Sequence, residues 1–592
     1  MQNIFDNLYE KSCRNYKFSS LMQYISCEEN ILLAHRNIKK NKGSTTVGTD
    51  KLDITHYKEW DKDKFVNYFQ NKLSNYQPKS VRRVEIPKPN GKTRPLGIPC
   101  MDDRIIQQCI KQVLEPICEA KFHKHSYGFR PNRSTDHAIA KCMKLMNKSQ
   151  LHYVVDIDIK GFFDNVNHAK LKKQLWNLGI QDKNLISIIG KILKSEIQGE
   201  GIPTKGTPQG GIISPLLSNI VLNELDWWVS SQWETFQTKK NYTKIRKTGQ
   251  IDLSHKYRAM RNTQLKEIWL VRYADDFKIF TKDYITAKKV YNATKMWLKE
   301  RLGLDISPDK SKITNVRKNK TEFLGFTLKV KPKGKKYICQ SNMSDKAKKN
   351  TINKIKQQIK IIQNKCDSKE ASKLNSIILG SHNYYNIATN VSRDFSDIDF
   401  LVTKTLDIRL KNYLSDKPKM SETYKRIYGN YKGKIRTIQN VTLFPIYGCK
   451  TKPPMCFSQD ICNYTINGRE LVHKKLSGFY HLIEHLLKSS HKTQSVEYND
   501  NKISLIAGQK GTCYVTGYPL EIGEMECHHK KPRELGGTDE YKNLVWVNTN
   551  AHKLIHSTKP DTINKYLKIL NLDEKGLKRL NSLRKQVGNL AI

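Results

Sequence analysis

Apolar and acidic positions are arranged in one short stretch in a way that predicts a β-hairpin. An apolar run at 269–271 and a mostly apolar run at 277–280 enclose the tetrapeptide Tyr-Ala-Asp-Asp, which ends in Asp275 and Asp276. Two such runs joined by a tight turn are typical of paired strands, so both acids are expected at the hairpin tip. Carboxylate oxygens are the ligands that Mg²⁺ prefers, and the tip is therefore a candidate metal site.

A second buried strand is predicted to bring a third acid to the same site. Sites that bind two divalent ions about 4 Å apart need more than two carboxylates. The β-branched run that begins at Val154 leads into Asp156 and Asp158 and then into a turn. By spacing we favour Asp158 over Asp156, because an isoleucine, two adjacent aromatic residues and Val166 follow it.

Helical periodicity marks the region after residue 340. Isoleucines recur there at helical spacing, at Ile352, Ile355, Ile359 and Ile362. Lysines fill the positions around them, at Lys346, Lys348, Lys349, Lys354, Lys356 and Lys360. Between Lys331 and Lys365, Asp345 is the single acid. The pattern predicts an amphipathic helix with a basic face.

The charge of the chain indicates a polyanionic partner. The 592 residues include 104 Lys and Arg against 56 Asp and Glu, which gives a formal net charge of +48. That excess is far beyond what solubility requires, so nucleic acid is the expected partner, and RNA is the obvious candidate. The chain shows neither the pattern of a signal peptide nor an apolar run of about 20 residues, so no membrane partner is expected.

The number and spacing of the cysteines indicate the redox state of the compartment in which the protein works. The 13 cysteines are scattered singly, which indicates free thiols in a reducing environment. Cys449, Cys456 and Cys462 lie close together in a turn-rich stretch and are candidate zinc ligands, although their spacing is irregular. Abundant Lys, Asn and Ile suggest an AT-rich genome. We expect a bacterial cytoplasmic protein, with an organelle-encoded protein as the alternative.

Histidines gather near the carboxyl end. His552 and His556 stand four residues apart, on one face of a predicted helix, where they can chelate one ion. Upstream lie the adjacent pair His528 and His529, and Asn543 stands between the two groups. The coupling of these elements makes the segment a second candidate metal site.

Seven ordered blocks resemble those of group II intron reverse transcriptases. In chain order they are 88–99, 127–131 (Tyr-Gly-Phe-Arg-Pro), the Asp158 segment, 206–215 (containing Pro-Gln-Gly-Gly), the Tyr-Ala-Asp-Asp box, 306–310 (Ile-Ser-Pro-Asp-Lys) and 323–326 (Phe-Leu-Gly-Phe). The resemblance implies a right-hand polymerase with fingers, palm and thumb that acts on an RNA template and a primer. It also implies that the loop at 39–50 lies near the template and that the basic helices grip intron RNA.

Site roles follow from this resemblance by position. Asp158, Asp275 and Asp276 would be the catalytic carboxylates that bind Mg²⁺. Nucleotide-binding roles fall on Lys88, Arg94, Phe163, Gln209 and Gly210. Lys88 and Arg94 would clamp the triphosphate, and the glycine would let the backbone approach a nucleotide closely. Phe163 would reject a 2′-hydroxyl and select deoxynucleotides, with Phe162 as the alternative, because adjacent aromatic residues in a strand point to opposite faces.

The carboxyl-terminal histidines resemble those of an HNH nuclease, a ββα-metal site. Position by position, His528, His552 and His556 would bind a divalent metal, Mg²⁺ or similar. His529 would be the general base on a water molecule, since an imidazole with a pKa near 6.5 suits that role. Asn543 would orient His529. The paired Cys-x-x-Cys motifs of a structural zinc, common in such nucleases, are absent, so we expect a core held by packing alone.

Together these features predict an α+β multidomain chain: a right-hand polymerase with a helical maturase thumb domain and a C-terminal ββα-metal HNH domain. The expected ranges are 1–340 for fingers and palm, 341–445 for the maturase domain, 446–500 for a DNA-binding region and 501–592 for the HNH endonuclease. The expected function is RNA-directed DNA synthesis, splicing support and DNA nicking in intron mobility. Expected partners are group II intron RNA, target DNA, dNTPs and a second copy in a homodimer. The alternatives are a splicing-only RNA-binding maturase and a reverse transcriptase of another bacterial retroelement.

Overall fold

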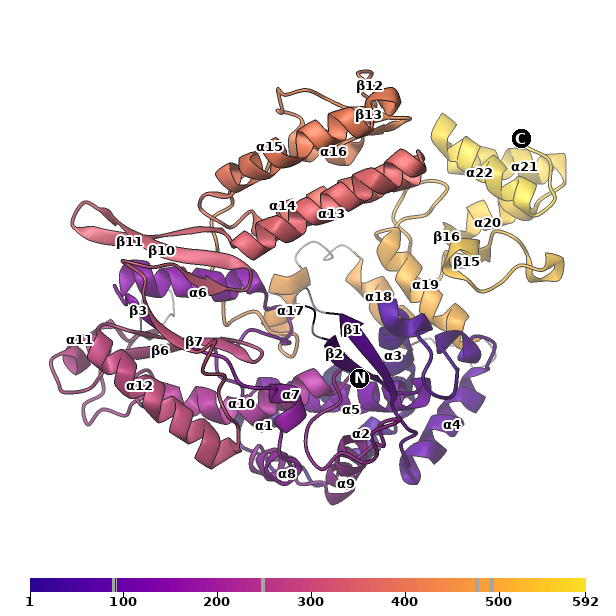
Figure 1. Ribbon diagram of the computed structural model, residues 1–592. Helices are drawn as coiled ribbons and strands as arrows, with labels where there is room; N and C mark the ends of the chain where they lie inside the picture. The colour runs from indigo at the N-terminus through magenta and orange to yellow at the C-terminus, as the bar shows by residue number, and fades with distance from the viewer. Residues whose placement is uncertain (88–90, 92, 246–250, 474–478, 489–494) are drawn as a thin grey trace. The chain divides into compact units, whose positions relative to one another are not determined.

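A computed structural model describes the chain except for residues 88–90, 92, 246–250, 474–478 and 489–494 (Figure 1). The chain divides into two compact units, each assembled from segments far apart in the sequence. Unit 1 consists of Met1–Lys121, Asn167–Leu217 and Asp460–Ile592, and unit 2 of Phe122–Val166 and Ser218–Gln459. In the part of the chain that the structure describes, we find no helix that combines the length and the apolar character needed to cross a membrane.

Unit 2 is built on an antiparallel sheet. Its first elements are α6 (Thr135–Lys148), β3 (Tyr153–Ile157), α7 (Phe162–Asn165), α10 (Ser214–Ser231, in this unit from Ser218), β4 (Lys244–Ile245), β5 (Ile251–Asp252), α11 (Ser254–Arg261), β6 (Ile268–Tyr273), β7 (Asp276–Thr281), α12 (Tyr284–Trp297), η3 (Leu298–Leu302) and β8 (Lys312–Asn315). Strands β6, β7, β3 and β8 lie side by side in that order. Residues 268–272 and 277–281 are buried, as expected for β-branched and aromatic residues on a packed sheet. The predicted hairpin and the predicted strand beside it are confirmed.

The rest of unit 2 combines small sheets with a layer of long helices. These elements are β9 (Thr321–Phe323), β10 (Phe326–Lys333), β11 (Lys336–Met343), α13 (Asp345–Asn364), α14 (Ser368–Tyr385), α15 (Val391–Arg409), η4 (Lys411–Tyr413), β12 (Leu414–Ser415), α16 (Glu422–Tyr428), β13 (Thr437–Ile438) and β14 (Val441–Thr442). Helix α13 packs against α14 and α15 (Figure 1). It confirms the predicted amphipathic helix, since Ile355, Ile359 and Ile362 are buried while Lys349 and Lys360 are exposed.

The amino-terminal part of unit 1 packs around one buried helix. Its elements are α1 (Gln2–Cys13), α2 (Met22–Ile25), α3 (Glu28–Lys39), η1 (Lys42–Thr45), η2 (Ile54–Tyr57), α4 (Lys62–Ser74), β1 (Arg82–Pro87), β2 (Thr93–Ile98), α5 (Met101–Glu119), α8 (His168–Asn177) and α9 (Lys183–Leu193). Helices α1 to α4 contact α5, nearly all of whose side chains are buried. Polar residues on α5 therefore need partners: Asp102, for example, accepts hydrogen bonds from Tyr68 and Lys72.

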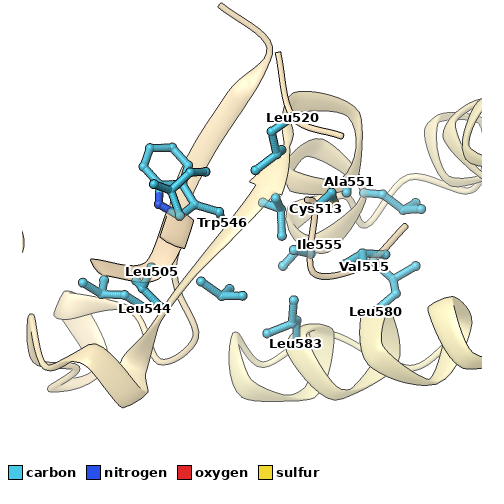
Figure 2. Close-up of a cluster of buried hydrophobic side chains, with 14 of the residues drawn as sticks. Leu505, Cys513, Val515, Leu520, Leu544, Trp546, Ala551, Ile555, Leu580 and Leu583 are labelled. Atoms are coloured by element: carbon cyan, nitrogen blue, oxygen red, sulfur yellow. The ribbon is translucent and has the colours of Figure 1, made fainter. Parts of the chain in front are cut away.

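The carboxyl-terminal part of unit 1 has its own hydrophobic core. Its elements are α17 (Ile466–His473), α18 (Tyr480–Lys488), α19 (Val496–Gly508), β15 (Met525–His529), η5 (Arg533–Leu535), η6 (Tyr541–Asn543), β16 (Leu544–Asn548), α20 (Thr549–His556), α21 (Pro560–Leu570) and α22 (Glu574–Gln586). The paired strands β15 and β16 precede α20, which is the order of a ββα element. Leu505, Trp546, Ile555 and Leu583 meet in the core from α19, β16, α20 and α22 (Figure 2). Leu482 of α18 belongs to the same core, which therefore begins before the predicted HNH range.

Candidate active sites

The hairpin of β6 and β7 places two acids at the end of the unit 2 sheet. Tyr273 pairs with Asp276, and Ala274 and Asp275 form the two-residue turn between them. Ala274 has a φ of +58°, a conformation that alanine rarely adopts. Gly128 lies directly against the turn, because a Cβ atom at this position would come within 2.3 Å of the Ala274 backbone nitrogen. The close approach of Gly128 thus helps to define the shape of the turn that carries both acids.

Asp156 and Asp158 occupy different environments near this tip. Asp156 is buried, forms an ion pair with Lys278 and accepts a hydrogen bond from Thr321 Oγ1 at 2.9 Å. Asp158 lies just beyond β3, is partly exposed, and its Oδ2 lies 3.1 Å from Lys310 Nζ. A buried carboxylate with a lysine partner serves the fold, so the surroundings favour Asp158 as the third acid.

Asp276 has the electrostatics of a crowded carboxylate. Desolvation in the turn raises the pKa of Asp276 to about 6, aided by the negative charges of Asp156, Asp275 and Asp158 and opposed by Lys278. A divalent cation would offset this repulsion, and an all-oxygen donor set suits Mg²⁺. Among the described residues, three ligand atoms within 4.8 Å of one another occur at histidines rather than at these acids. The acids nevertheless offer oxygen ligands, which Mg²⁺ prefers, and they lie at the same end of the sheet.

A fully buried ion pair braces the turn, and the sequence analysis missed it. Arg272 donates to both carboxylate oxygens of Asp226, at 2.7 and 2.6 Å. Its Nη1 also donates to Asn219 Oδ1 at 2.9 Å and to the carbonyl of Ala274 at 2.8 Å. Asn219 in turn donates to the carbonyl of Gly128 at 2.9 Å. Arg272 is therefore a positioning residue for the acids. In the sequence, an arginine within an apolar strand could have indicated that it has a buried acidic partner.

Arg272→Ala is expected to destabilise unit 2 by about 3–5 kcal/mol, because it leaves the Asp226 carboxylate buried without its cation. Guanidinium denaturation followed by circular dichroism measures the change. Lys425→Ala is the control: it removes an ion pair with Glu422 in which the two side chains are 61% and 92% exposed. That pair is expected to contribute less than about 1 kcal/mol. Equal losses in the two variants would contradict a bracing role for Arg272.

The aromatic pair after Asp158 is helical and not extended, so the strand argument of the sequence analysis was wrong. Phe162 begins α7 directly after Gly161, whose φ of +52° turns the chain out of the strand. The Phe162 side chain is only 2% exposed, whereas Phe163 is partly exposed. The difference in exposure, rather than alternation along a strand, favours Phe163 as the residue that meets a nucleotide.

The nucleotide-binding residues predicted in unit 1 lie on a hairpin and a loop that contact each other. Arg94 is exposed on β2, and the Gly97 N–H on the same strand donates to the Gln209 carbonyl at 2.6 Å. Gly210 has a φ of +118°, and a Cβ atom there would lie 2.3 Å from the Gly97 carbonyl oxygen. Gly210 is thus required for packing of the loop on β2, in addition to any contact with a nucleotide. Lys88 lies outside the described residues.

Three histidines converge in the carboxyl-terminal part of unit 1. The ligand nitrogens of His528 from β15 and of His552 and His556 from α20 all lie within 4.8 Å of one another. His528 Nε2 is buried and has no hydrogen-bond partner in the described part of the chain. Burial, aided by the neighbouring histidines, lowers the pKa of His528 to about 3. Three neutral imidazoles fit a divalent metal such as zinc or nickel better than the predicted Mg²⁺, which prefers oxygen.

The fourth histidine is held by an acid that the sequence analysis did not identify. His529 Nε2 lies 2.8 Å from Asp539 Oδ1, and Arg533 donates to both Asp539 oxygens at 2.8 and 2.9 Å. Burial favours the protonated acid, but hydrogen bonds from His529, Ser495 and Arg533 outweigh it and hold the pKa of Asp539 below its usual range. An ionised Asp539 accepts a hydrogen bond from the N–H at Nε2 of His529. The other ring nitrogen, Nδ1, is then the one without a proton and can act as the base.

Asn543, predicted to orient His529, has its side chain hydrogen-bonded to the backbone. Its Nδ2 donates to the carbonyls of Lys531 at 3.0 Å and Thr538 at 2.8 Å. Its Oδ1 accepts from the Lys531 N–H at 2.9 Å. These bonds close the loop that carries Asp539, so Asn543 acts on His529 through that loop.

The candidate zinc cysteines do not form a cluster. Cys449 is buried in unit 2 with its Sγ 3.7 Å from the His382 carbonyl, Cys456 is exposed, and Cys462 belongs to unit 1. Among the residues that the structure describes, the histidine group is the set of three possible ligands found within 4.8 Å. The 13 cysteines are free thiols, as predicted.

Comparison with known proteins adds family relationships to this geometry. The profile of the reverse transcriptase (RNA-dependent DNA polymerase) family matches residues 86–328, which include Asp158, Asp275 and Asp276. The chain is 33% identical over 328 residues to Protein YkfC of Escherichia coli K12, a match that covers 53% of this chain and 83% of that protein. It is 31% identical over 376 residues to the group II intron-encoded protein LtrA of Lactococcus lactis subsp. cremoris, covering 57% of this chain and 60% of LtrA.

Proposed function

Because this chain belongs to the reverse transcriptase (RNA-dependent DNA polymerase) family, we propose that it synthesises DNA on an RNA template at the tip of the β6–β7 hairpin. The observation that carries this proposal is the placement of Asp275 and Asp276 on a turn whose carbonyl is held by buried Arg272. Asp158 is the third acid at the same end of the sheet. The curated relatives over this region include group II intron-encoded proteins, which supports a role in intron mobility.

The chain's contribution to such a reaction is chiefly geometric. Asp158, Asp275 and Asp276 would hold Mg²⁺, which when bound stabilises charge on the transferred phosphoryl group. The primer 3′-hydroxyl would lose its proton to solvent, its oxygen would bond to the α-phosphorus of a dNTP, and the bond between the α- and β-phosphates would break to release pyrophosphate. A braced turn keeps the carboxylates in place without reorganisation during the reaction, and this preorganisation favours the transition state.

Incorporation of labelled dTTP by the full chain on poly(rA) primed with oligo(dT) tests the proposal. We expect DNA synthesis that requires both poly(rA) and Mg²⁺. Absence of synthesis, with RNA binding retained, would favour the splicing-only maturase instead. A reverse transcriptase of another bacterial retroelement would also make DNA in this assay, and a group II intron flanking the gene distinguishes it.

Phe163→Ala is expected to admit ribonucleotides, because a partly exposed ring after the Asp158 turn would otherwise clash with the 2′-hydroxyl. The ratio of kcat/KM for dTTP to that for UTP is expected to fall at least about tenfold. Steady-state primer extension with each nucleotide gives the ratio. Phe162→Leu, a change at the buried neighbour, is the control and is expected to leave the ratio unchanged. A change in the ratio with Phe162→Leu alone would transfer the role to Phe162.

We also propose that the carboxyl-terminal part of unit 1 nicks DNA. The support is the convergence of His528, His552 and His556 beside His529. A water oxygen would bond to phosphorus, the water proton would pass to His529, and the 3′-oxygen of the preceding nucleotide would leave. A metal held by the three histidines would stabilise the developing charge. The product carries a free 3′-hydroxyl, the kind of end that a reverse transcriptase extends.

Group II intron RNA is the partner that the relatives and the charge favour. LtrA is encoded by such an intron, and helix α13 presents exposed lysines on the side opposite its buried isoleucines. Contacts of lysines with phosphates would give binding that weakens as salt rises. We therefore include support of intron splicing in the proposal, together with location in a bacterial cytoplasm.

A further inference from the structure

Helix α19 presents acids to cations from the amino-terminal part of unit 1. Two contacts involve α19 itself: Arg36 Nε with Asp500, and Lys39 Nζ with Glu497 Oε1 at 3.3 Å. A third joins Lys58 Nζ to Glu540 Oε1 at 2.9 Å, and Glu540 directly precedes η6. We call these three contacts the docking pairs. The chain carries a formal charge of +48, so basic residues outnumber acids in it. Here acids lie opposite cations from a distant segment. Such charge complementarity fixes how two surfaces align.

Two of the docking pairs are shielded from water. The side chains of Asp500 and Glu497 are 8% and 9% exposed, and that of Arg36 is 14% exposed. Removing one partner therefore leaves a charge unpaired in a poorly hydrated place. The start of α19 is also tied by backbone hydrogen bonding, in an isolated antiparallel bridge between Asp61 and Ser495. Helix α19 is thus held against the amino-terminal part by both charge and backbone.

The same helix supports the general base of the proposed nuclease. The Tyr498 ring stacks on His529, with centroids 5.4 Å apart and planes 10° from parallel. Ser495 Oγ donates to Asp539 Oδ2 at 2.5 Å, and Asn501 Nδ2 donates to the Asp539 carbonyl at 2.7 Å. Asp539 in turn accepts from His529. The acids that pair with Arg36 and Lys39 and the groups that support His529 therefore lie on α19 or at its N-cap.

We propose that docking of α19 on α3 positions His529, so that the nuclease cuts DNA efficiently only while it is held against the amino-terminal part of the chain. Arg36 and Asp500 are then positioning residues that act on catalysis through α19. This inference rests on the proposed nuclease activity. It makes nicking depend on an interface within unit 1 and not on the ββα element alone.

A charge swap tests the inference in the full chain. Arg36→Glu and Asp500→Arg are each expected to lower the rate constant for nicking of supercoiled plasmid DNA with Ni²⁺ at least about tenfold, because small displacements of a reacting group are costly. The KM for DNA is expected to stay constant. The double variant restores the pair with reversed charges and is expected to recover most of the rate. Primer extension is expected to be unchanged in all three variants.

The rate of amide hydrogen exchange in α19 tests the docking independently of nuclease activity. Amides of α19 are expected to exchange faster in Arg36→Glu and to return to the wild-type rate in the double variant. Arg14→Glu is the matched control, since the side chains of Arg14 and its partner Glu10 are 77% and 64% exposed. Nicking that is lost with His529→Ala but unaffected by either single swap would overturn the inference and leave the nuclease standing. Wild-type nicking no faster than that of His529→Ala would remove the nuclease and the inference together, whatever the exchange rates show.

Discussion

Replacing Asp275 and Asp276 by alanine is expected to abolish DNA synthesis on poly(rA) primed with oligo(dT). The two carboxylates supply most of the negative charge at the hairpin tip, and the metal that they would hold stabilises the transition state by several kcal/mol. At 1.36 kcal/mol for each factor of ten, the loss in kcat is at least about 10³-fold. Radiolabelled dTTP incorporation over time measures it.

The control for this experiment is Asp309→Ala, which removes a carboxylate that is exposed outside the hairpin. That variant is expected to keep wild-type activity. The double variant at the tip should still bind RNA, because the lysines of α13 are untouched; filter binding checks this. Retention of even about a tenth of the wild-type rate by the double variant would rule out a catalytic role for these acids.

Replacing His529 by alanine is expected to lower DNA nicking by about 10² to 10⁴-fold, the usual contribution of a general base. His529 is held by ionised Asp539 at 2.8 Å and is stacked on Tyr498, so its orientation is fixed before DNA binds. Conversion of supercoiled plasmid to the open circle, with Ni²⁺ present, measures the rate.

His255→Ala is the matched control, because His255 is exposed on α11 in unit 2. Nicking by this variant is expected to equal that of the wild type. His528→Ala is expected to lose nicking as well, but through metal binding, so that raising the metal concentration should restore part of its rate and none of the rate of His529→Ala. Rescue of both variants by metal would contradict the assignment of His529 as the base.

The parts of the fold that the sequence predicted are those with a local period. The run that ends in Asp275 and Asp276 has an apolar strand on each side, and α13 repeats its isoleucines at helical spacing; both elements are where we expected them. The ββα order near His528 and His552 was implied by the resemblance to HNH nucleases, and β15, β16 and α20 follow that order. Local periodicity reports which face of an element is buried, and that is sufficient to place these residues on their elements.

The missed features depend on contacts between residues distant in the sequence or on backbone geometry. Arg272 pairs with Asp226, which lies 46 residues earlier in the chain. No periodic sequence pattern indicates that these two residues are in contact. Asp539 lies ten residues after His529, in a loop that the side chain of Asn543 closes through backbone hydrogen bonds. The helix that begins at Phe162 follows a glycine in the left-handed conformation. The residues around it resemble those of a strand, so the sequence did not predict this turn.

The most direct measurement is the sequence of the DNA made by the purified full chain on a defined heteropolymeric RNA with an annealed DNA primer, dNTPs and Mg²⁺. The account predicts a product complementary to the RNA, lost when the RNA is digested beforehand and absent with Asp275→Ala/Asp276→Ala. A product of equal yield from that double variant, or no RNA-templated product from the wild type, would contradict a reverse transcriptase centred on the hairpin tip.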